Sequence, residues 1–157
     1  MVIAGLPKNK NTILLLQIIE LGLSVIAYFL LGGYVGAIIS LISIYRNNLV
    51  FHNKLNIKYK SSIITLTLLI TTIFNNQNII GYLPIISNII YICFINTQDI
   101  IKFKFLIIIQ MIMWTIYDYL TKAYIESIFD TFYIMTNLIS IIIIYHKNCK
   151  EYVKIII

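Results

Sequence analysis

The stretch "LGGYVGAIISLISIYRN", residues 31–47, combines the features that decide the fold of this chain. It opens on two glycines, Gly32 and Gly33, continues through small and branched apolar residues, and closes near Arg46. Because glycine tolerates positive φ values, the glycine pair predicts a tight turn. An apolar run that ends on a permanent cation is typical of a helix leaving the bilayer on its basic side. Small residues after the turn, such as Gly36, would let a second helix approach closely.

The composition excludes an ordinary water-soluble domain. The chain has 157 residues, of which 60% are hydrophobic and 11% charged, and its formal net charge is +6. Soluble domains carry about 25% charged residues. The cations are not gathered in one patch, which argues against nucleic acid and leaves the lipid bilayer as the partner. Cys93 and Cys149 have the spacing of neither a metal site nor a disulfide framework.

Apolar segments separated by short polar connectors predict an all-α membrane protein with six transmembrane helices. A spanning helix needs about 20 mostly apolar residues, within a range of roughly 17 to 25. The segment 59–75 is the weakest of the six, because its apolar stretch is short and Lys60 would have to extend toward the surface. We interpret 1–157 as a single transmembrane domain with a cytoplasmic tail at 147–157. The predicted helices are 12–31, 34–51, 59–75, 79–96, 103–120 and 124–145.

The positions of the lysines and the arginine test this topology independently. Cytoplasmic connectors of inner-membrane proteins carry an excess of Lys and Arg. Every second connector here is basic, and all cations except Lys122 fall on one side. Six spans with both termini in the cytoplasm reproduce this alternation, whereas five or seven would place a basic loop outside. The cations on the common side are Lys8, Lys10, Arg46, Lys54, Lys58, Lys60, Lys102, Lys104, Lys147, Lys150 and Lys154.

Polar side chains inside the predicted spans are spaced by threes and fours, which places them on one face of each helix. In hydrocarbon such residues face other protein groups or a water-filled cavity. They predict either a polar central path or hydrogen bonds from helix to helix, worth roughly 0.6 to 2 kcal/mol each. The sets are Gln17, Glu20, Ser24 and Tyr28; Gly36, Ser40, Ser43 and Asn47; Pro84, Asn88 and Tyr91; Gln110, Trp114, Tyr117 and Thr121; and Glu126, Asp130, Tyr133, Asn137 and Ser140.

Two groups of charged residues lie within or beside these spans. Glu20 and Arg46 would lie at nearly the same depth on neighbouring helices, so we expect an ion pair that acts as a gate or fixes the topology. Asp118, Glu126 and Asp130 surround the last turn between helices, at the outer face. They predict an acidic mouth for cationic or polyhydroxyl solutes, or simply solubilising residues around the one cation of that turn.

Enzymatic chemistry has no support in the sequence. His52 and His146 fall at cytoplasmic helix ends without the spacing of metal ligands. The chain has no GxSxG, HExxH or phosphate-binding glycine motif, and its carboxylates are too scattered to argue for an acid–base pair. We therefore predict no enzyme, no cofactor and no metal site.

Parts of the chain resemble one another. The alignment predicts an incomplete first helical repeat at 12–51, a linker helix at 59–75 and a three-helix second repeat at 79–146. Parallel repeats beside a linker helix are typical of several transporter folds. The similar pairs are "SLISIYRN" (40–47) with "NLISIIIIYHKN" (137–148), and "ILLLQIIELGLSVIAY" (13–28) with "FLIIIQMIMWTIYDY" (105–119), which sets Gln17 against Gln110.

The segments "KNKNTILLLQ…YFLLGGYVGAIISLISIYRNNLVF" and "GYLPIISNIIYICF" resemble the bacterial inner-membrane YgjV family over roughly residues 8–146. That family is similar to the PQ-loop group, which includes SWEET and SemiSWEET sugar carriers and nicotinamide riboside carriers. The resemblance implies a 3+1+3 plan of seven helices. This chain would lack the first of them, which again gives six helices with both ends inside.

The same resemblance implies an asparagine in the third helix of each repeat. Asn137 matches this position in the second repeat. In the first repeat Ser40 or Ser43 occupies the expected level, with Asn47 a turn deeper. The resemblance implies no particular solute.

We therefore predict a facilitator or transporter of a small polar solute, sugar- or vitamin-like, in the bacterial inner membrane. The alternative is a non-transporting membrane scaffold or assembly partner. A midplane cavity of about 300 Å³ or more would favour the carrier, and a packed interior the scaffold. A unit that lacks a helix could obtain one from a second copy, so a homodimer is one predicted assembly. The residues predicted to line the solute path are Ser43, Asn88, Trp114, Tyr117 and Asn137.

Overall fold

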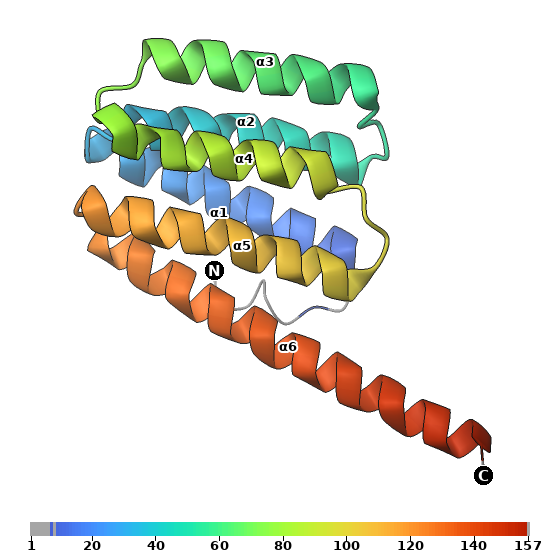
Figure 1. Cartoon of the computed structure of the whole chain (residues 1–157). Coiled ribbons are helices and arrows are strands. Elements are labelled where there is room, and N and C mark those ends of the chain that lie inside the picture. The colour runs from blue at the N-terminus through green and yellow to red at the C-terminus, as the bar shows by residue number, and fades with distance from the viewer. Residues whose placement is uncertain (1–6, 8, 157) are drawn as a thin grey trace.

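The computed structural model describes residues 7 and 9–156, and the side chains of residues 7 and 9–146 (Figure 1). This part of the chain forms six α-helices and a short 3₁₀ helix, η2, and contains no strand. The helices lie side by side, and each runs back along the one before it. The elements are α1 (Lys10–Leu30), α2 (Tyr34–Phe51), α3 (Ile57–Ile73), η2 (Asn78–Gly81), α4 (Tyr82–Phe94), α5 (Ile100–Leu120) and α6 (Tyr124–Ile156).

The all-helical prediction is confirmed for the described residues, but only four helices have the length and apolarity of a membrane span. These are α1, α2, α5 and the segment Tyr124–His146 of α6. Helix α3 has 17 residues, and the apolar run Asn78–Phe94 is also shorter than the four. The 3+1+3 plan therefore remains a prediction, and α3 and α4 are the shorter members of the bundle.

The hairpins α1–α2 and α5–α6 turn in the same way. The backbone N–H of Gly33 donates to the carbonyl of Tyr28, and that of Ala123 donates to the carbonyl of Asp118, both at 2.8 Å. This bond pattern is the Schellman motif, which needs one residue with positive φ. Gly32 supplies it in the first hairpin with φ 72°, as the sequence predicted.

The equivalent residue of the second hairpin is Lys122, with φ 65°. A residue with a Cβ atom is strained in this conformation by roughly 1 to 2 kcal/mol. The second turn therefore has the same backbone geometry as the first, although a lysine replaces the glycine.

A constant separation of 90 residues relates the two hairpins. Helices α1 and α5 have 21 residues each and begin at Lys10 and Ile100, while α2 and α6 begin at Tyr34 and Tyr124. Equivalent N-cap residues, Asn9 and Asp99, accept hydrogen bonds from the first backbone N–H groups of their helices. Equivalent ring pairs also recur, with centroids 6.2 Å apart in Phe29–Tyr34 and 5.7 Å apart in Tyr119–Tyr124.

This register corrects the predicted alignment of the repeats. Glu20, not Gln17, is the counterpart of Gln110, and Asn47, not Ser40 or Ser43, is the counterpart of Asn137. The predicted alignment relied on a shared Leu-Ile-Ser triplet, which arises easily by chance in an isoleucine-rich chain. Turn and cap geometry is the more specific marker.

Helix α6 is longer than predicted. It continues past residue 145 to Ile156 and leaves the bundle, so most of the predicted tail is helical (Figure 1). The predictions for Lys8 and for the side chains of Lys147, Cys149, Lys150 and Lys154 lie outside the described residues.

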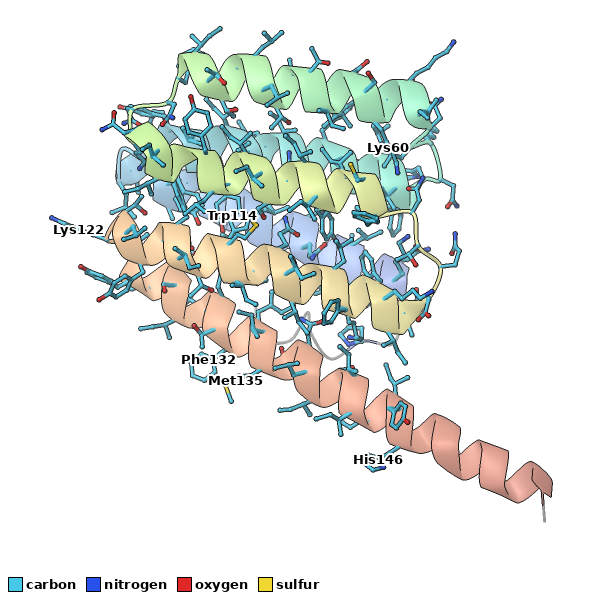
Figure 2. All side chains as sticks on the ribbon, in the orientation of Figure 1. Lys60, Trp114, Lys122, Phe132, Met135 and His146 are labelled. Carbon is cyan, nitrogen blue, oxygen red and sulfur yellow. The ribbon has the colours of Figure 1, made fainter. Side chains whose placement is uncertain are left out.

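Two lysines at one end of the bundle donate hydrogen bonds to backbone carbonyl groups near the end of α4. The Nζ of Lys10 donates to the carbonyls of Ile95 (2.6 Å) and Thr97 (3.0 Å), and the Nζ of Lys60 donates to the carbonyl of Cys93 (3.1 Å). Lys122 lies at the opposite end (Figure 2). The grouping of these cations at one end is as predicted, while the assignment of that end to the cytoplasm remains a prediction.

Candidate functional site

Buried polar residues gather in the interior of the bundle. They form two groups. The first, the arginine cluster, consists of Gln17, Ser43, Arg46, Asn47, Thr67, Asn88 and Tyr91. The second, the acidic cavity, is lined by Glu20, Leu21, Ser24, Tyr28, Ser40, Gln110, Met111, Trp114 and Asp130.

The arginine cluster surrounds a guanidinium that is 1% exposed. The Nε and Nη2 of Arg46 donate to Oδ1 of Asn47 at 3.0 and 2.9 Å, and its Nη1 donates to Oδ1 of Asn88. The guanidinium carbon lies 4.2 Å from the centroid of the Tyr91 ring. Two amide oxygens and a cation–π contact thus replace the water that Arg46 loses on burial.

Further bonds tie this cluster to its neighbours. The amide of Asn88 donates to Oγ1 of Thr67 on α3 (3.2 Å) and accepts from Oγ of Ser43 on α2 (3.3 Å). On the other side Gln17 accepts from Tyr91 and donates to the hydroxyl of Tyr133 on α6, both at 3.2 Å. The network therefore connects α1, α2, α3, α4 and α6.

The predicted ion pair between Glu20 and Arg46 is not formed. Arg46 points from α2 toward α4, where it contacts Asn88 and Tyr91. Glu20 lies on the side of α1 that faces α5 and α6, and its Oε2 is buried without a hydrogen-bond partner. The two side chains point to different faces of the hairpin.

The acidic cavity lies between the two hairpins and has a volume of about 30 Å³. Its lining is arranged in pairs that the 90-residue register relates, so it lies where the two copies face each other. The pairs are Glu20 with Gln110, Leu21 with Met111, Ser24 with Trp114, and Ser40 with Asp130.

One hydrogen bond joins equivalent residues of the two copies beside this cavity. The hydroxyl of Tyr28 donates to Oδ1 of Asp118 at 2.7 Å. The carboxyl group of Asp118 also bonds to the side chain of Asp130, whereas Oε2 of Glu20 and Oγ of Ser40 are buried without a partner. Buried polar atoms in proteins are nearly always hydrogen-bonded. Two unpartnered oxygens in the cavity wall, those of Glu20 and Ser40, therefore make this cavity the candidate binding site.

Aromatic rings form one wall of the cavity. The Trp114 ring lies 5.6 Å from that of Tyr28 and 5.7 Å from that of Tyr117, centroid to centroid. Trp114 points from α5 into the bundle (Figure 2). A Cβ atom on Gly36 would come within 2.9 Å of the Tyr28 ring and 3.1 Å of the Tyr117 hydroxyl. The small residue predicted on α2 is thus what lets α1 and α5 approach.

A groove between α1 and α6 shares Glu20 and Ser24 with the acidic cavity. Its volume is about 340 Å³, and its walls are mostly apolar, with Glu126 at one edge. The remaining lining residues are Leu23, Ala27 and Phe129. The carboxylates predicted as an acidic mouth are therefore distributed over the groove, the cavity and the hydrogen bond to Tyr28, and Glu20 joins them from α1.

The residues predicted to line a solute path fall into two places. Ser43 and Asn88 bond to each other in the arginine cluster, while Trp114 and Tyr117 contact each other at the acidic cavity. Asn137 is fully buried, donates to the carbonyl of Tyr133 at 2.9 Å, and has an unpartnered Oδ1. Their role in binding remains a prediction.

Sequence reasoning missed that Tyr28 bonds to Asp118 and that Ser40 lines the same cavity as Glu20 and Asp130. Both were recognised as members of polar faces, but nothing in their spacing relates them to the second hairpin. The matched turns at Gly32 and Lys122 are the signal that relates them, since that register pairs Ser40 with Asp130 and Tyr28 with Asp118.

The outer surface of the bundle is rich in large apolar side chains, and its interior combines an apolar core with buried polar residues. Large apolar side chains of α6 point away from the other helices, as Phe132 and Met135 show (Figure 2). With four helices suited to spanning a bilayer, this arrangement defines a multi-pass helical membrane protein. Residues 1–148 match the Imp-YgjV family, described as bacterial inner membrane protein, and the chain belongs to that family. No curated protein and no solved structure matches the chain.

Proposed function

We propose that this inner-membrane protein carries a small polar solute across the bilayer by rocking the hairpin α1–α2 against the hairpin α5–α6. The observation that supports the proposal is the acidic cavity, whose lining residues come from both hairpins and include two unpartnered polar atoms. Transporters built from repeats bind their solutes at such interfaces and expose them to either side by moving one repeat against the other.

The packing within and between the hairpins favours this motion. Within each hairpin the two helices contact each other along most of their length, whereas α1 and α6 barely touch and leave the groove between them. The arginine cluster would hold α2 and α4 together during rocking, with Ser43, Asn88 and Asn137 along the path beyond the cavity.

The proposed orientation places both termini in the cytoplasm. It is supported by Lys10 and Lys60, which lie at one end of the bundle, opposite to Lys122. A cysteine introduced at Lys54, with Cys93 and Cys149 replaced by serine, should resist membrane-impermeant thiol reagents in intact cells. Labelling of this cysteine from outside the cell would contradict the proposed orientation.

Uptake of small polar solutes by proteoliposomes tests the proposed transport. We expect saturable uptake of at least one solute by the wild type and its loss in Asn137→Ala, whose side chain has an unpartnered buried oxygen. The matched control is Asn48→Ala, since Asn48 is an exposed asparagine of α2. A panel in which no solute moves, or in which both variants transport equally, would contradict the proposal.

The packed interior favours a second candidate, a membrane scaffold that does not transport. The acidic cavity, at about 30 Å³, is far smaller than the roughly 300 Å³ at which ligand pockets begin. A carrier must therefore open it, whereas a scaffold need not. Crosslinking in membranes distinguishes the two, because a homodimer or stable complex without any solute uptake would favour the scaffold.

A further inference from the structure

The chemistry of the acidic cavity identifies the class of solute. We propose that the cavity binds the primary ammonium group of a small organic cation whose apolar part occupies the groove between α1 and α6. This deepens the proposed transport function, on which its physiological meaning rests, but binding itself can be tested without transport.

The first argument is charge. Glu20 and Asp130 line the cavity from opposite hairpins, and Asp118 lies beside it, bonded to Tyr28. The described lining of the cavity and of the groove includes no lysine or arginine. Arg46, one of the buried cations of the described residues, is engaged by two asparagines and a tyrosine ring. Carboxylates in a low-dielectric interior are stabilised by a positive partner, and the residues that line the cavity and the groove supply none.

The second argument is the set of unpartnered acceptors. Ser40 is fully buried, lines the cavity and has no hydrogen-bond partner for its Oγ, and Oε2 of Glu20 is likewise unpartnered. A primary ammonium group carries three N–H donors and no acceptor. It can therefore donate to Glu20, Ser40 and Asp130 at once, which a quaternary ammonium group cannot do.

The third argument is size and shape. The cavity holds a group about as large as one water molecule, which is also the size of an ammonium group. The Trp114 and Tyr28 rings lie in its wall, and aromatic faces attract cations. The adjoining groove, of about 340 Å³, offers Leu23, Ala27 and Phe129 to an apolar body. Head and body of the cation thus each have a matching surface.

A cluster of metal ligands is not the better explanation. Among the described residues no three His, Cys, Asp or Glu side chains are grouped so as to hold a metal ion. An inorganic ion also has no apolar part that could occupy the groove. Sodium remains the relevant competitor, and it is included in the test.

The experiment uses the full-length protein in detergent micelles and the fluorescence of Trp114, the only tryptophan of the chain. The probe is n-butylammonium chloride. Tetramethylammonium chloride, which has the charge without N–H donors, n-butanol, which lacks the charge, and sodium chloride serve as comparisons. We expect a saturable change with butylammonium and a much weaker response to the three others.

Variants locate the site. Glu20→Gln and Asp130→Asn should each weaken butylammonium binding about tenfold or more, because each removes a charge-assisted hydrogen bond. Ser40→Ala should weaken it less while leaving the fold intact, and it keeps the test decisive if a carboxylate variant does not fold. Asp99→Asn is the matched control, since it removes a carboxylate far along the chain while asparagine still caps α5.

Three results would overturn the ammonium site: no saturable response, an equal response to sodium or tetramethylammonium, or equal affinity in Ser40→Ala and wild type. The proposed transport function can be rejected independently of the ammonium site. Binding that survives all these controls while proteoliposomes take up neither butylammonium nor any other solute would keep the site and reject the carrier.

Discussion

The arginine cluster and the acidic cavity are both buried, both polar and both at the contact between helices, yet they differ in how their polar atoms are satisfied. Around Arg46 the hydrogen-bonding groups find partners within the chain, including the ring of Tyr91. In the acidic cavity, Oε2 of Glu20 and Oγ of Ser40 have none. The first arrangement is complete without any other molecule, whereas the second is not.

The difference separates structural polarity from functional polarity. A closed network of side chains specifies how helices pack and has little room for a ligand. An incomplete network in a membrane interior is costly to the folded state, so its presence indicates a use that compensates for the cost. Substitutions in the two regions should accordingly have opposite effects on stability.

The largest expected effect is that of Arg46→Met. It leaves Oδ1 of Asn47 and of Asn88 buried without their main donor, which we expect to lower the free energy of unfolding by about 3 kcal/mol. The paired variant is Glu20→Gln, which removes a charge whose Oε2 has no partner and should leave stability unchanged or higher. Denaturation in mixed micelles, followed by Trp114 fluorescence, measures both. Equal losses would remove the distinction between the two regions.

A smaller effect is expected from Gly36→Ala. The added methyl group would clash with Tyr28 and Tyr117, so it should push α1 and α5 away from α2 at a cost of about 1 to 3 kcal/mol. Gly22→Ala is the control, because a Cβ atom there meets nothing within 4 Å. That variant should be neutral or more stable by up to about 1 kcal/mol. Similar thermal unfolding of both variants would show that the aromatic wall is loosely packed.

The smallest effects concern two serines on the same helix. Ser43→Ala removes a donor from Oδ1 of Asn88 and should cost about 1 kcal/mol. Ser40→Ala removes a hydroxyl that has no partner and should change the free energy of unfolding by less than about 0.5 kcal/mol. One denaturation series measures the free energy of unfolding of both variants. If Ser40→Ala cost more than Ser43→Ala, the hydroxyl of Ser40 would already make a hydrogen bond within the acidic cavity.

Much of the fold could be predicted from the sequence. Apolar run length and the turn at Gly32 located the helices, because these depend on local composition and backbone freedom. The direction of individual side chains could not be predicted in the same way. Glu20 and Arg46 are at similar distances along the chain from the glycine turn, but which neighbour each faces depends on the rotation of α1 and α2 within the bundle.

The candidate site was predicted only in pieces. Trp114, Tyr117, Asn88 and Ser43 were selected for their polarity and helical face, and all are buried. Their division between two clusters follows from the pairing of the hairpins. The matching turns reveal that pairing, but the second turn has Lys122 at the position of Gly32, so the sequence does not show the match. No spacing rule within one helix contains that information.

The paired lining of the acidic cavity gives the molecule a built-in electrical asymmetry. Two unchanged copies of one hairpin would present the same residue from both sides, and a ligand between them would have no preferred way to face. Here an acid stands opposite an amide and a hydroxyl opposite an acid. A bound molecule with unlike ends would therefore settle in one direction only, because the residues at equivalent positions of the two hairpins differ.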